Sequence, residues 1–481
     1  MNPARVNKRP GARSSTWTGC AEPDILTAMS SVLTPASIAA PHLIENDPGI
    51  AELLALRPQL SMQAASGLML EDVPLNAIAD SLGTPVWVTS AGTLRARYRR
   101  LRAALDEAGL NASVHYAVKA NDHLAVLRVL SAEGAGADVV SGGELRRARM
   151  AGIDPARIVF SGVGKSAAEL RLALDEGIGQ INVESAEEIE MLSALADSMN
   201  RHARIALRVN PDIDAGTHAK ITTGRSDNKF GIPYRDIASL YGHAATLPGL
   251  VPVGLAVHIG SQIASAAPFR AAYARIAELV QGLRDNGQTV GTVDCGGGLG
   301  ISYRDEIEGS PRALAGAIRA TLGSLGLHLA VEPGRWLAAP SGVLLSSVLR
   351  VKRMPDAAPP FIVLDSAMND LLRPSMYESW HGLLPLSSRL ATRPTSAAHV
   401  VGPVCETGDT FARDRLLPPL QAGDRVAILD TGAYGSVMSS TYNARPLAAQ
   451  ALVDGARWTC IRPRQDIESL WRDEIVPSWV G

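Results

Sequence analysis

A lysine with the context of a possible nucleophile lies at the end of an apolar run. Lys119 follows residues 114–118 within the sequence Val-His-Tyr-Ala-Val-Lys-Ala-Asn, which ends at Asn121. Because a buried ammonium group is costly, such a lysine is either paired with an acid or lowered in pKa for Schiff-base chemistry with an aldehyde. The residue alone leaves both possibilities open, and a structural ion pair is the more frequent explanation.

A run of three glycines indicates either a phosphate site or a tight turn. Gly296, Gly297 and Gly298 follow Asp294 and Cys295. Successive glycines let backbone N–H groups approach a phosphate closely, although a plain turn also favours them. The spacing does not match GxxxxGK[ST], so a nucleoside triphosphatase is disfavoured.

Two further short segments combine polar groups that could bind a ligand. Glu332-Pro-Gly-Arg335 places an acid and a guanidinium on one short turn, and His258-Ile-Gly-Ser261 follows an apolar run. A surface ion pair and a buried core histidine are the simpler explanations if each segment is considered alone.

The elements that precede these residues recur regularly. Eight short β-rich runs, mostly followed by amphipathic helical stretches, predict βαβ units in a parallel sheet. These runs are residues 114–118, 138–140, 157–160, 180–183, 204–209, 254–259, 292–295 and 328–331. Their span suits a (β/α)₈ barrel of about 250 residues. Periodicity cannot show closure, so an open doubly wound sheet is the alternative.

A barrel would bring the candidate residues together. The C-terminal ends of barrel strands face one mouth, where active sites are built. Lys119, His258, the glycine run and the turn that begins at Glu332 each follow one of the predicted strands.

The chain is expected to have a second domain. Residues 342–351, 360–364, 398–401 and 425–429 are short, β-rich and separated by Pro/Gly turns, which predicts a mainly antiparallel C-terminal domain. We therefore expect a poorly ordered extension (1–61), a segment packed on the β domain (62–91), the barrel (92–340) and the β domain (341–481). Residues 85–89 are expected to form a strand and 93–108 a helix.

Composition narrows the functional classes. The 481 residues carry 46 Lys+Arg and 48 Asp+Glu, a balance that argues against a nucleic-acid partner. No apolar run reaches the ~18–20 residues of a membrane span. The scattered cysteines Cys20, Cys295, Cys405 and Cys460 fit a reducing compartment and exclude a cysteine-rich metal site. We expect a cytoplasmic protein without a metal, although the basic leader before Glu22 leaves an organelle transit peptide possible.

Seven motifs in order identify the chain as similar to a known family. They are Tyr116-Ala-Val-Lys-Ala-Asn121, Asn228-Lys-Phe-Gly231, His258-Ile-Gly-Ser-Gln262, Glu332-Pro-Gly-Arg335, Gly402-Pro-Val-Cys-Glu406 with Asp409, Gly432-Ala-Tyr-Gly435 and Tyr442-Asn-Ala-Arg-Pro446. Together they resemble the fold-type III pyridoxal-phosphate decarboxylases, the group acting on ornithine, diaminopimelate and arginine, over roughly residues 65–475. The resemblance implies an alanine racemase-like fold, a barrel plus a β domain.

The resemblance also implies cofactor-binding roles. Lys119 would hold pyridoxal phosphate through a Schiff base, and Glu332 would pair with the ring nitrogen and keep it protonated. The other implied cofactor-binding residues are His258 on the ring face and Ser261, Gly297, Gly298, Gly334, Arg335 and Tyr434 at the phosphate.

Substrate-binding roles are implied as well. Arg373-Pro-Ser-Met-Tyr377 resembles the family element for substrate carboxylates, with Arg335 and Tyr434 nearby. A guanidinium can bind a carboxylate through two parallel hydrogen bonds. In this family two subunits complete each site, so Cys405, a candidate proton donor, and Glu406, for the distal ammonium, would reach the neighbouring subunit's cofactor in a homodimer.

The function implied is decarboxylation of meso-2,6-diaminopimelate to L-lysine and CO₂, the last step of lysine synthesis. One alternative is the same chemistry on another amino acid or a carrier-bound one. Another is a non-catalytic pyridoxal-phosphate-binding paralogue, which the presence of Lys119 and Cys405 disfavours.

Overall fold

The computed structural model describes residues 47–213 and 229–481 of the chain. Most of the expected N-terminal extension, including Cys20, lies outside the described residues. So does Asn228, the first residue of one of the seven motifs.

The eight predicted strands form a closed parallel barrel, which rules out the open doubly wound sheet. Neighbouring strands pair in the order β5-β6-β7-β8-β9-β11-β12-β13, and β13 pairs back with β5. The strands are β5 (Ala112–Ala117), β6 (Gly136–Val139), β7 (Ile158–Phe160), β8 (Gln180–Val183), β9 (Ala203–Asn210), β11 (Leu250–Val257), β12 (Thr292–Asp294) and β13 (His328–Val331). A short strand, β10 (Ile232–Pro233), pairs with the end of β9.

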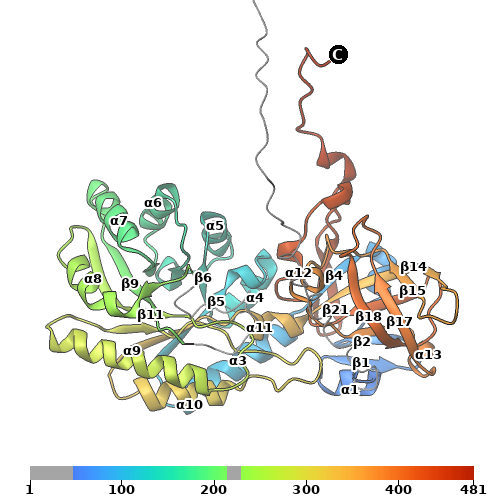
Figure 1. The fold of residues 1–481 in the computed structure, drawn as a ribbon, viewed down its shortest axis with the longest axis horizontal. Coiled ribbons are helices and arrows are strands. Elements are labelled where there is room, and N and C mark those ends of the chain that lie inside the picture. The colour runs from blue at the N-terminus through green and yellow to red at the C-terminus, as the bar shows by residue number, and fades with distance from the viewer. Residues whose placement is uncertain (1–46, 214–228) are drawn as a thin grey trace, which may run out of the picture. The chain divides into compact units, whose positions relative to one another are not determined.

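Helices cover the outside of the barrel (Figure 1). They are α3 (Ala91–Glu107), α4 (Leu124–Ala132), α5 (Gly142–Met150), α6 (Ala167–Glu176), α7 (Ala186–Ser198), α8 (Ile237–Ala244), α9 (Ala267–Asp285), α10 (Pro311–Leu322) and the short α11 (Arg335–Ala338). Local sequence explains several of their ends. Helix α6 begins with a capping box between Ser166 and Glu169 and ends at Gly177, which has a left-handed conformation with φ 63°.

The C-terminal domain is mainly antiparallel, as predicted. Its strands are β14 (Gly342–Lys352), β15 (Phe361–Leu364), β16 (Leu383–Pro385), β17 (Ser396–Val401), β18 (Thr410–Leu417), β19 (Arg425–Ile428), β20 (Ala449–Asp454) and β21 (Arg457–Arg462), with the short helices α12 (Arg373–Tyr377) and α13 (Ser388–Ala391). The strand β4 (Val86–Ser90), which precedes the barrel in the sequence, lies between β14 and β20. This sheet therefore contains strands from before and after the barrel (Figure 1).

The N-terminal segment packs on the same domain. Helix α1 (Ile50–Ala55), the small sheet of β1 (Leu60–Gln63), β2 (Gly67–Leu70) and β3 (Val73–Pro74), and helix α2 (Leu75–Leu82) share an apolar core with β4, β14 and β19. Helix α1 lies within residues 1–61, which were expected to be poorly ordered. We therefore propose that the ordered chain begins before residue 50.

A buried ion pair connects this segment to the rest of the protein. The Arg57 guanidinium contacts Asp430 Oδ2 at 2.9 Å from Nε and 2.5 Å from Nη2, and both side chains are nearly inaccessible to water. Arg57 also donates to the backbone carbonyls of Leu53 and Tyr303, each at 2.8 Å. The N-terminal segment is thus held against a barrel loop and the β domain at one point.

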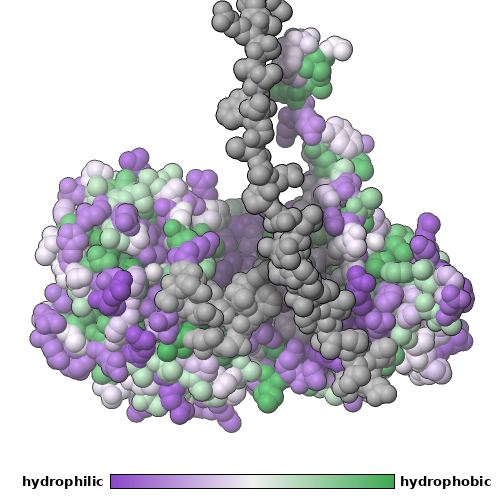
Figure 2. Space-filling model, in the orientation of Figure 1, coloured by the Kyte–Doolittle hydropathy of each residue, from purple (hydrophilic) through white to green (hydrophobic). Residues whose placement is uncertain are grey.

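Apolar side chains remain exposed at the C-terminal end. Ile475 is 88% and Trp479 82% exposed, and hydrophobic residues are visible there among polar ones in Figure 2. Large apolar side chains that lie together on a surface mark contact with another molecule. Among the described helices, none is both long and apolar enough to cross a membrane.

Replacing Arg57 by Met should lower the free energy of unfolding by about 3–5 kcal/mol, because the change leaves the Asp430 carboxylate buried without its partner. Denaturant unfolding of the purified protein measures this. Arg312→Met is the matched control. Its ion pair with Glu107 is 78% and 55% exposed, so a loss below about 1 kcal/mol is expected. Equal losses in the two variants would contradict a structural role for Arg57.

Candidate active site

A ring of polar side chains closes the barrel at the C-terminal ends of its strands. Every one of the eight barrel strands supplies one member, either from its last residues or from the residues that directly follow it. The members are Lys119, Asp138, Ser161, Asn182, Arg208, His258, Asp294 and Glu332. All of them except Asp138 line one small cavity. Polar groups in such a layer influence one another strongly because little water separates them.

Lys119 lies in a single 3₁₀ turn (Val118–Ala120) that directly follows β5. Its Nζ is 3.1 Å from Oδ2 of Asp138, whose carboxylate is completely buried. Burial lowers the pKa of the Lys119 ammonium, but the nearby acidic groups, Asp138 foremost, raise it by more in sum, so the pKa lies above its ordinary value. Lys119 is therefore ion-paired and lines the cavity with its pKa raised, which agrees with the first of the two alternatives and not with a lowered pKa.

The surroundings of Glu332 favour the protonated form of its carboxyl group. Burial raises the pKa of its carboxyl group well above the usual range, and the nearby carboxylates of Asp138 and Asp294 raise it further. Ser161 Oγ donates to Glu332 Oε1 at 3.4 Å, and Asn182 donates to Asp294 at 3.0 Å. The cavity thus contains one acid that can hold and share a proton.

His258 is neutral. Burial, together with the charges of Arg208 and Lys119, lowers the pKa of its imidazole well below the ordinary value. Its Nδ1 accepts a hydrogen bond from the Gly297 N–H at 3.1 Å, so the ring hydrogen resides on Nε2. The histidine therefore connects the wall of the cavity to the glycine run.

The glycine run has no room for side chains. A Cβ at Gly297 would lie 2.2 Å from the Glu332 carbonyl oxygen, and one at Gly298, where φ is +111°, would lie 2.4 Å from the Gly260 carbonyl oxygen. The backbone can pass this closely only as glycine. The run is therefore a close approach between neighbouring strand ends rather than an ordinary surface turn.

Arg335 and Ser261 meet at the same mouth. Arg335 Nε and Nη2 donate to Ser261 Oγ at 3.2 and 3.1 Å, and the guanidinium carbon lies 4.9 Å from the centroid of the Tyr434 ring. Gly334 precedes Arg335, and a Cβ at this glycine would be 3.3 Å from the Tyr434 hydroxyl. The four residues form a compact group of hydrogen-bond donors.

A second cavity, of about 420 Å³, opens beside the first, and His258 lines both. Arg373 and Tyr377, from helix α12, line it together with Ser261, Arg335 and Tyr434. Arg373 is buried, with 5% of its surface exposed, which excludes the reading of this residue as a surface arginine. Eight of the thirteen predicted residues line the two cavities, and two of the predicted glycines lie next to lining residues, Gly297 through its hydrogen bond to His258 and Gly334 as the residue before Arg335.

Cys405 and Glu406 lie elsewhere. Both are exposed on the loop between β17 and β18, where the Cys405 N–H donates to Asn443 Oδ1 at 3.0 Å. Neither side chain lines the two cavities. A single chain therefore does not bring these two residues to the candidate site.

The donor set fits pyridoxal phosphate, which has an aldehyde, a basic ring nitrogen and a phosphate. Lys119 would supply an amine for the aldehyde and Glu332 a shared proton for the nitrogen. The N–H groups of Gly296 and Gly297 already donate to Asp294 and His258, so Gly298 and Ser261 would be the donors for the anion. Within the described residues, Oδ1 of Asp138 is buried without a hydrogen-bond partner. The polar layer therefore retains an acceptor for a hydrogen bond from a ligand. Across 47–213 and 229–481, no cluster of His, Cys, Asp and Glu is arranged to hold a metal ion.

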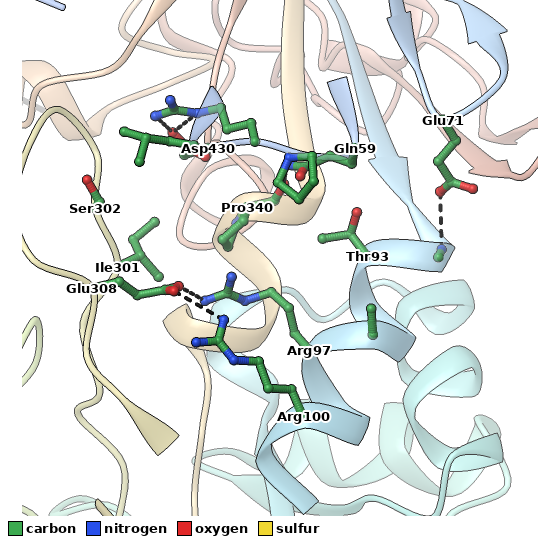
Figure 3. A pocket seen from close by; sticks show the side chains of 15 residues that line it. Gln59, Glu71, Thr93, Arg97, Arg100, Ile301, Ser302, Glu308, Pro340 and Asp430 are labelled. Carbon is green, nitrogen blue, oxygen red and sulfur yellow. Dashed lines mark hydrogen bonds and ion pairs between the residues drawn. The ribbon is translucent and has the colours of Figure 1, made fainter. Parts of the chain in front are cut away.

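Another cavity, of about 490 Å³, contains none of the predicted residues (Figure 3). Five of its charged side chains are paired with one another, Arg57 with Asp430, and Arg97 and Arg100 with Glu308. The sixth, Glu71, accepts hydrogen bonds from Ser90 and from the backbone N–H groups of Gly92 and Gly455. We therefore assign these charges a structural role.

Sequence reasoning missed several residues that line the two cavities or contact their lining. Asp138 and Asp294 lie within predicted strands. An acidic residue inside such an apolar run is unusual and could have indicated a functional position. Tyr303, Ser379 and His381 follow predicted motifs at a distance along the chain, and no spacing rule identifies them. All three contact the Arg373 guanidinium.

Comparison with known proteins agrees with this geometry. Residues 91–339 match the family model described as pyridoxal-dependent decarboxylase, pyridoxal binding domain. A diaminopimelate decarboxylase of Zymomonas mobilis is 49% identical over 86% of this chain and 98% of its own length. That of Pseudomonas aeruginosa is 44% identical over 85% of this chain and 96% of its own.

Solved structures of similar proteins have the same fold. The diaminopimelate decarboxylase of Helicobacter pylori, in complex with L-lysine, has a TM-score of 0.79 at 38% identity and covers 83% of this chain and 98% of its own. The diaminopimelate decarboxylase of M. jannaschi has a TM-score of 0.84 at 32% identity, with 89% and 100% covered.

Replacing Glu332 by Gln should change how the stability of the cofactor-free protein depends on pH. The folded chain raises the pKa of Glu332, so above the ordinary carboxyl range it holds a proton that the unfolded chain has lost, and stability falls as pH rises. The variant lacks this loss. Its stability relative to the native chain should rise by about 1.4 kcal/mol for each pH unit in that window, measured by urea unfolding from pH 5 to 8. If the free energy of unfolding of the two proteins depends on pH in the same way, Glu332 is ionised in the folded chain.

Proposed function

We infer, because this chain belongs to the diaminopimelate decarboxylase family of pyridoxal-dependent decarboxylases, that it converts meso-2,6-diaminopimelate to L-lysine and CO₂. One observation supports this substrate most directly. Two buried guanidinium groups, those of Arg335 and Arg373, line a cavity that adjoins the Lys119 cavity. A substrate whose far end carries a carboxylate would pair with them, whereas a simple diamino acid would leave them without an anion.

When bound, pyridoxal phosphate supplies a conjugated, protonated ring that accepts the electron pair left as CO₂ departs. We assign Lys119 Nζ the covalent attachment of the cofactor and Glu332 the proton at the ring nitrogen. The neutral imidazole of His258 would lie against the ring face, where it adds no charge that opposes protonation of the ring.

Asp138 sets the state of Lys119 in this scheme. Its buried carboxylate accepts a hydrogen bond from the Lys119 amine, and it would accept one from the same nitrogen when the cofactor is attached there. The glycine run, Ser261, Gly334 and Tyr434 would orient the phosphate.

Arg373 and Arg335 would bind the distal carboxylate, with Tyr377 at the rim of the same cavity. A guanidinium left buried and unpaired is unfavourable, so this pair should select against substrates that lack the second carboxylate. This argues against the alternative of the same chemistry on ornithine or another simple amino acid.

We further propose a cytoplasmic homodimer in which Cys405 and Glu406 of one subunit complete the site of the other. Their exposed position, outside both cavities of their own chain, supports this arrangement. The exposed apolar side chains near the C-terminus also favour contact with a second copy, since burial of each large one would contribute about 1.5–3 kcal/mol. In such a dimer Cys405 would supply a proton at the reacting carbon, and Glu406 would pair with the distal ammonium.

Purified, cofactor-loaded protein should release CO₂ from meso-2,6-diaminopimelate. Lys119→Ala should abolish this activity, because no other described side chain of the ring is an amine. Arg373→Ala should lower kcat/KM by about 10²–10³-fold, since it removes a buried charge-assisted contact. Release of CO₂ from ornithine or arginine but not from diaminopimelate would contradict the substrate assignment.

Mixing two inactive variants tests the shared site. Lys119→Ala and Cys405→Ala homodimers each lack one required residue at both sites, but a mixed dimer contains one intact site. Unfolding and refolding an equal mixture should restore about a quarter of the native activity, measured as released CO₂. If sedimentation shows that dimers have re-formed but no activity returns, Cys405 serves its own subunit.

A further inference from the structure

Tyr303 occupies an unusual position between the two guanidinium groups of the second cavity. Its hydroxyl oxygen accepts hydrogen bonds from Arg335 Nη1 at 2.9 Å and from Arg373 Nη1 at 2.8 Å. Like charges repel, so a shared acceptor is what allows these two cations to lie this close together. The hydroxyl therefore sets their spacing.

The tyrosine itself is firmly held. It lies in the loop that follows the glycine run and is 5% exposed. Its backbone carbonyl accepts from Arg57 Nη2, and its ring meets the His381 ring edge-on at 5.2 Å between centroids. The hydroxyl is thus fixed from the backbone side and from the ring side.

The groups around the two guanidiniums do not cancel their charge. His381 Nδ1 donates to the Leu429 carbonyl oxygen at 2.7 Å, so its Nε2 is the acceptor of the 3.2 Å contact from Arg373. Burial and the Arg373 charge hold the pKa of His381 well below the ordinary value, so the ring is neutral. Two carboxylates, those of Glu306 and Glu378, also line the cavity, and that of Glu306 accepts from the backbone N–H of Tyr303 at 2.9 Å rather than from either guanidinium.

A count of donors and acceptors leaves one hydrogen available. The phenolic oxygen uses its acceptor capacity on the two guanidiniums, and among the described residues its own hydrogen has no acceptor. Arg335 and Arg373 have no carboxylate within ion-pair distance in the part of the chain that the structure describes. An anion between them would therefore meet two positive charges and a hydroxyl donor.

We propose that Tyr303 is a specificity-determining residue of the substrate site, whose hydroxyl donates to the carboxylate that Arg335 and Arg373 hold. The inference rests on the proposed function and adds a residue to it. The ligand class is an amino acid whose carboxylate enters the second cavity. An amine of the same length without a carboxylate gains nothing from Tyr303.

The test compares two ligands of one chain length on the cofactor-loaded dimer, L-lysine and 1,5-diaminopentane, by titration calorimetry. Tyr303→Phe removes only the hydroxyl. It should weaken L-lysine binding about 10–100-fold, the range for a lost hydrogen bond to a charged group, and leave 1,5-diaminopentane binding unchanged. With diaminopimelate as substrate the loss should appear in KM, with kcat nearly constant, because the distal carboxylate is bound alike in ground state and transition state.

Tyr241→Phe is the matched control. Its hydroxyl also has one buried contact, to the Thr289 carbonyl oxygen at 2.7 Å, but it lies on α8 away from both cavities. Binding of both ligands should be unchanged in this variant.

Three outcomes would overturn the proposal. The first is unchanged L-lysine binding in Tyr303→Phe, and the second is an equal loss of affinity for L-lysine and 1,5-diaminopentane. The third is a loss of activity on diaminopimelate that appears only in kcat. If Tyr303→Phe does not fold, tyrosine at position 303 can be replaced by 3,5-difluorotyrosine, which keeps the ring and the hydroxyl in place. Its more acidic phenol should make L-lysine affinity fall at lower pH than in the native protein, and an unchanged pH profile would contradict the proposal. Native protein that releases no CO₂ from diaminopimelate refutes the proposed function instead, whatever Tyr303→Phe does.

Discussion

The buried carboxyl groups at the barrel mouth determine the charge state of the groups around them. Asp138 is inaccessible to water and lies 3.1 Å from Lys119 Nζ, which keeps that amine charged. Burial, followed by the nearby carboxyl groups of Asp138 and Asp294, raises the pKa of Glu332 well above the usual range. Because little solvent separates these groups, the charge of each one shifts the pKa of its neighbours. A substitution at one acid should therefore change the protonation of the others.

The scaffold holds this layer from two directions. The barrel strands position one member each, with a precision that loops alone do not provide. The β domain closes the same region from the other side. The Tyr434 N–H donates to the Ala120 carbonyl oxygen at 2.8 Å, and Asn121 donates to the Gly432 carbonyl oxygen at 3.1 Å. The turn that carries Lys119 is therefore bonded to the turn that carries Tyr434, and the chemistry depends on both domains.

Much of the fold could be predicted from the sequence because its period is regular. All eight barrel strands were located by short apolar runs, and only closure, a non-local property, required the structure. Ser141 and Ser185 prove to be helix caps, accepting from the N–H groups of Glu144 and Glu188. Eight of the predicted site residues line the two cavities, whereas their roles stay predictions.

What escaped prediction depends on contacts between distant segments. Arg57 reaches Asp430 and Tyr303 from a segment that the composition assigned to a poorly ordered extension, and only the buried pair reveals its role. Tyr303 and His381 both contact Arg373, and these contacts appear only once three separate segments are seen together.

The central claim is that Lys119 is the amine that this polar layer holds for the cofactor. Borohydride reduction of the pyridoxal-phosphate-loaded protein, followed by peptide mass spectrometry, tests it directly. The account predicts a phosphopyridoxyl group on Lys119 in nearly every chain, and none in Lys119→Ala. A label on Lys165 or on a surface lysine, with Lys119 unmodified, would contradict it.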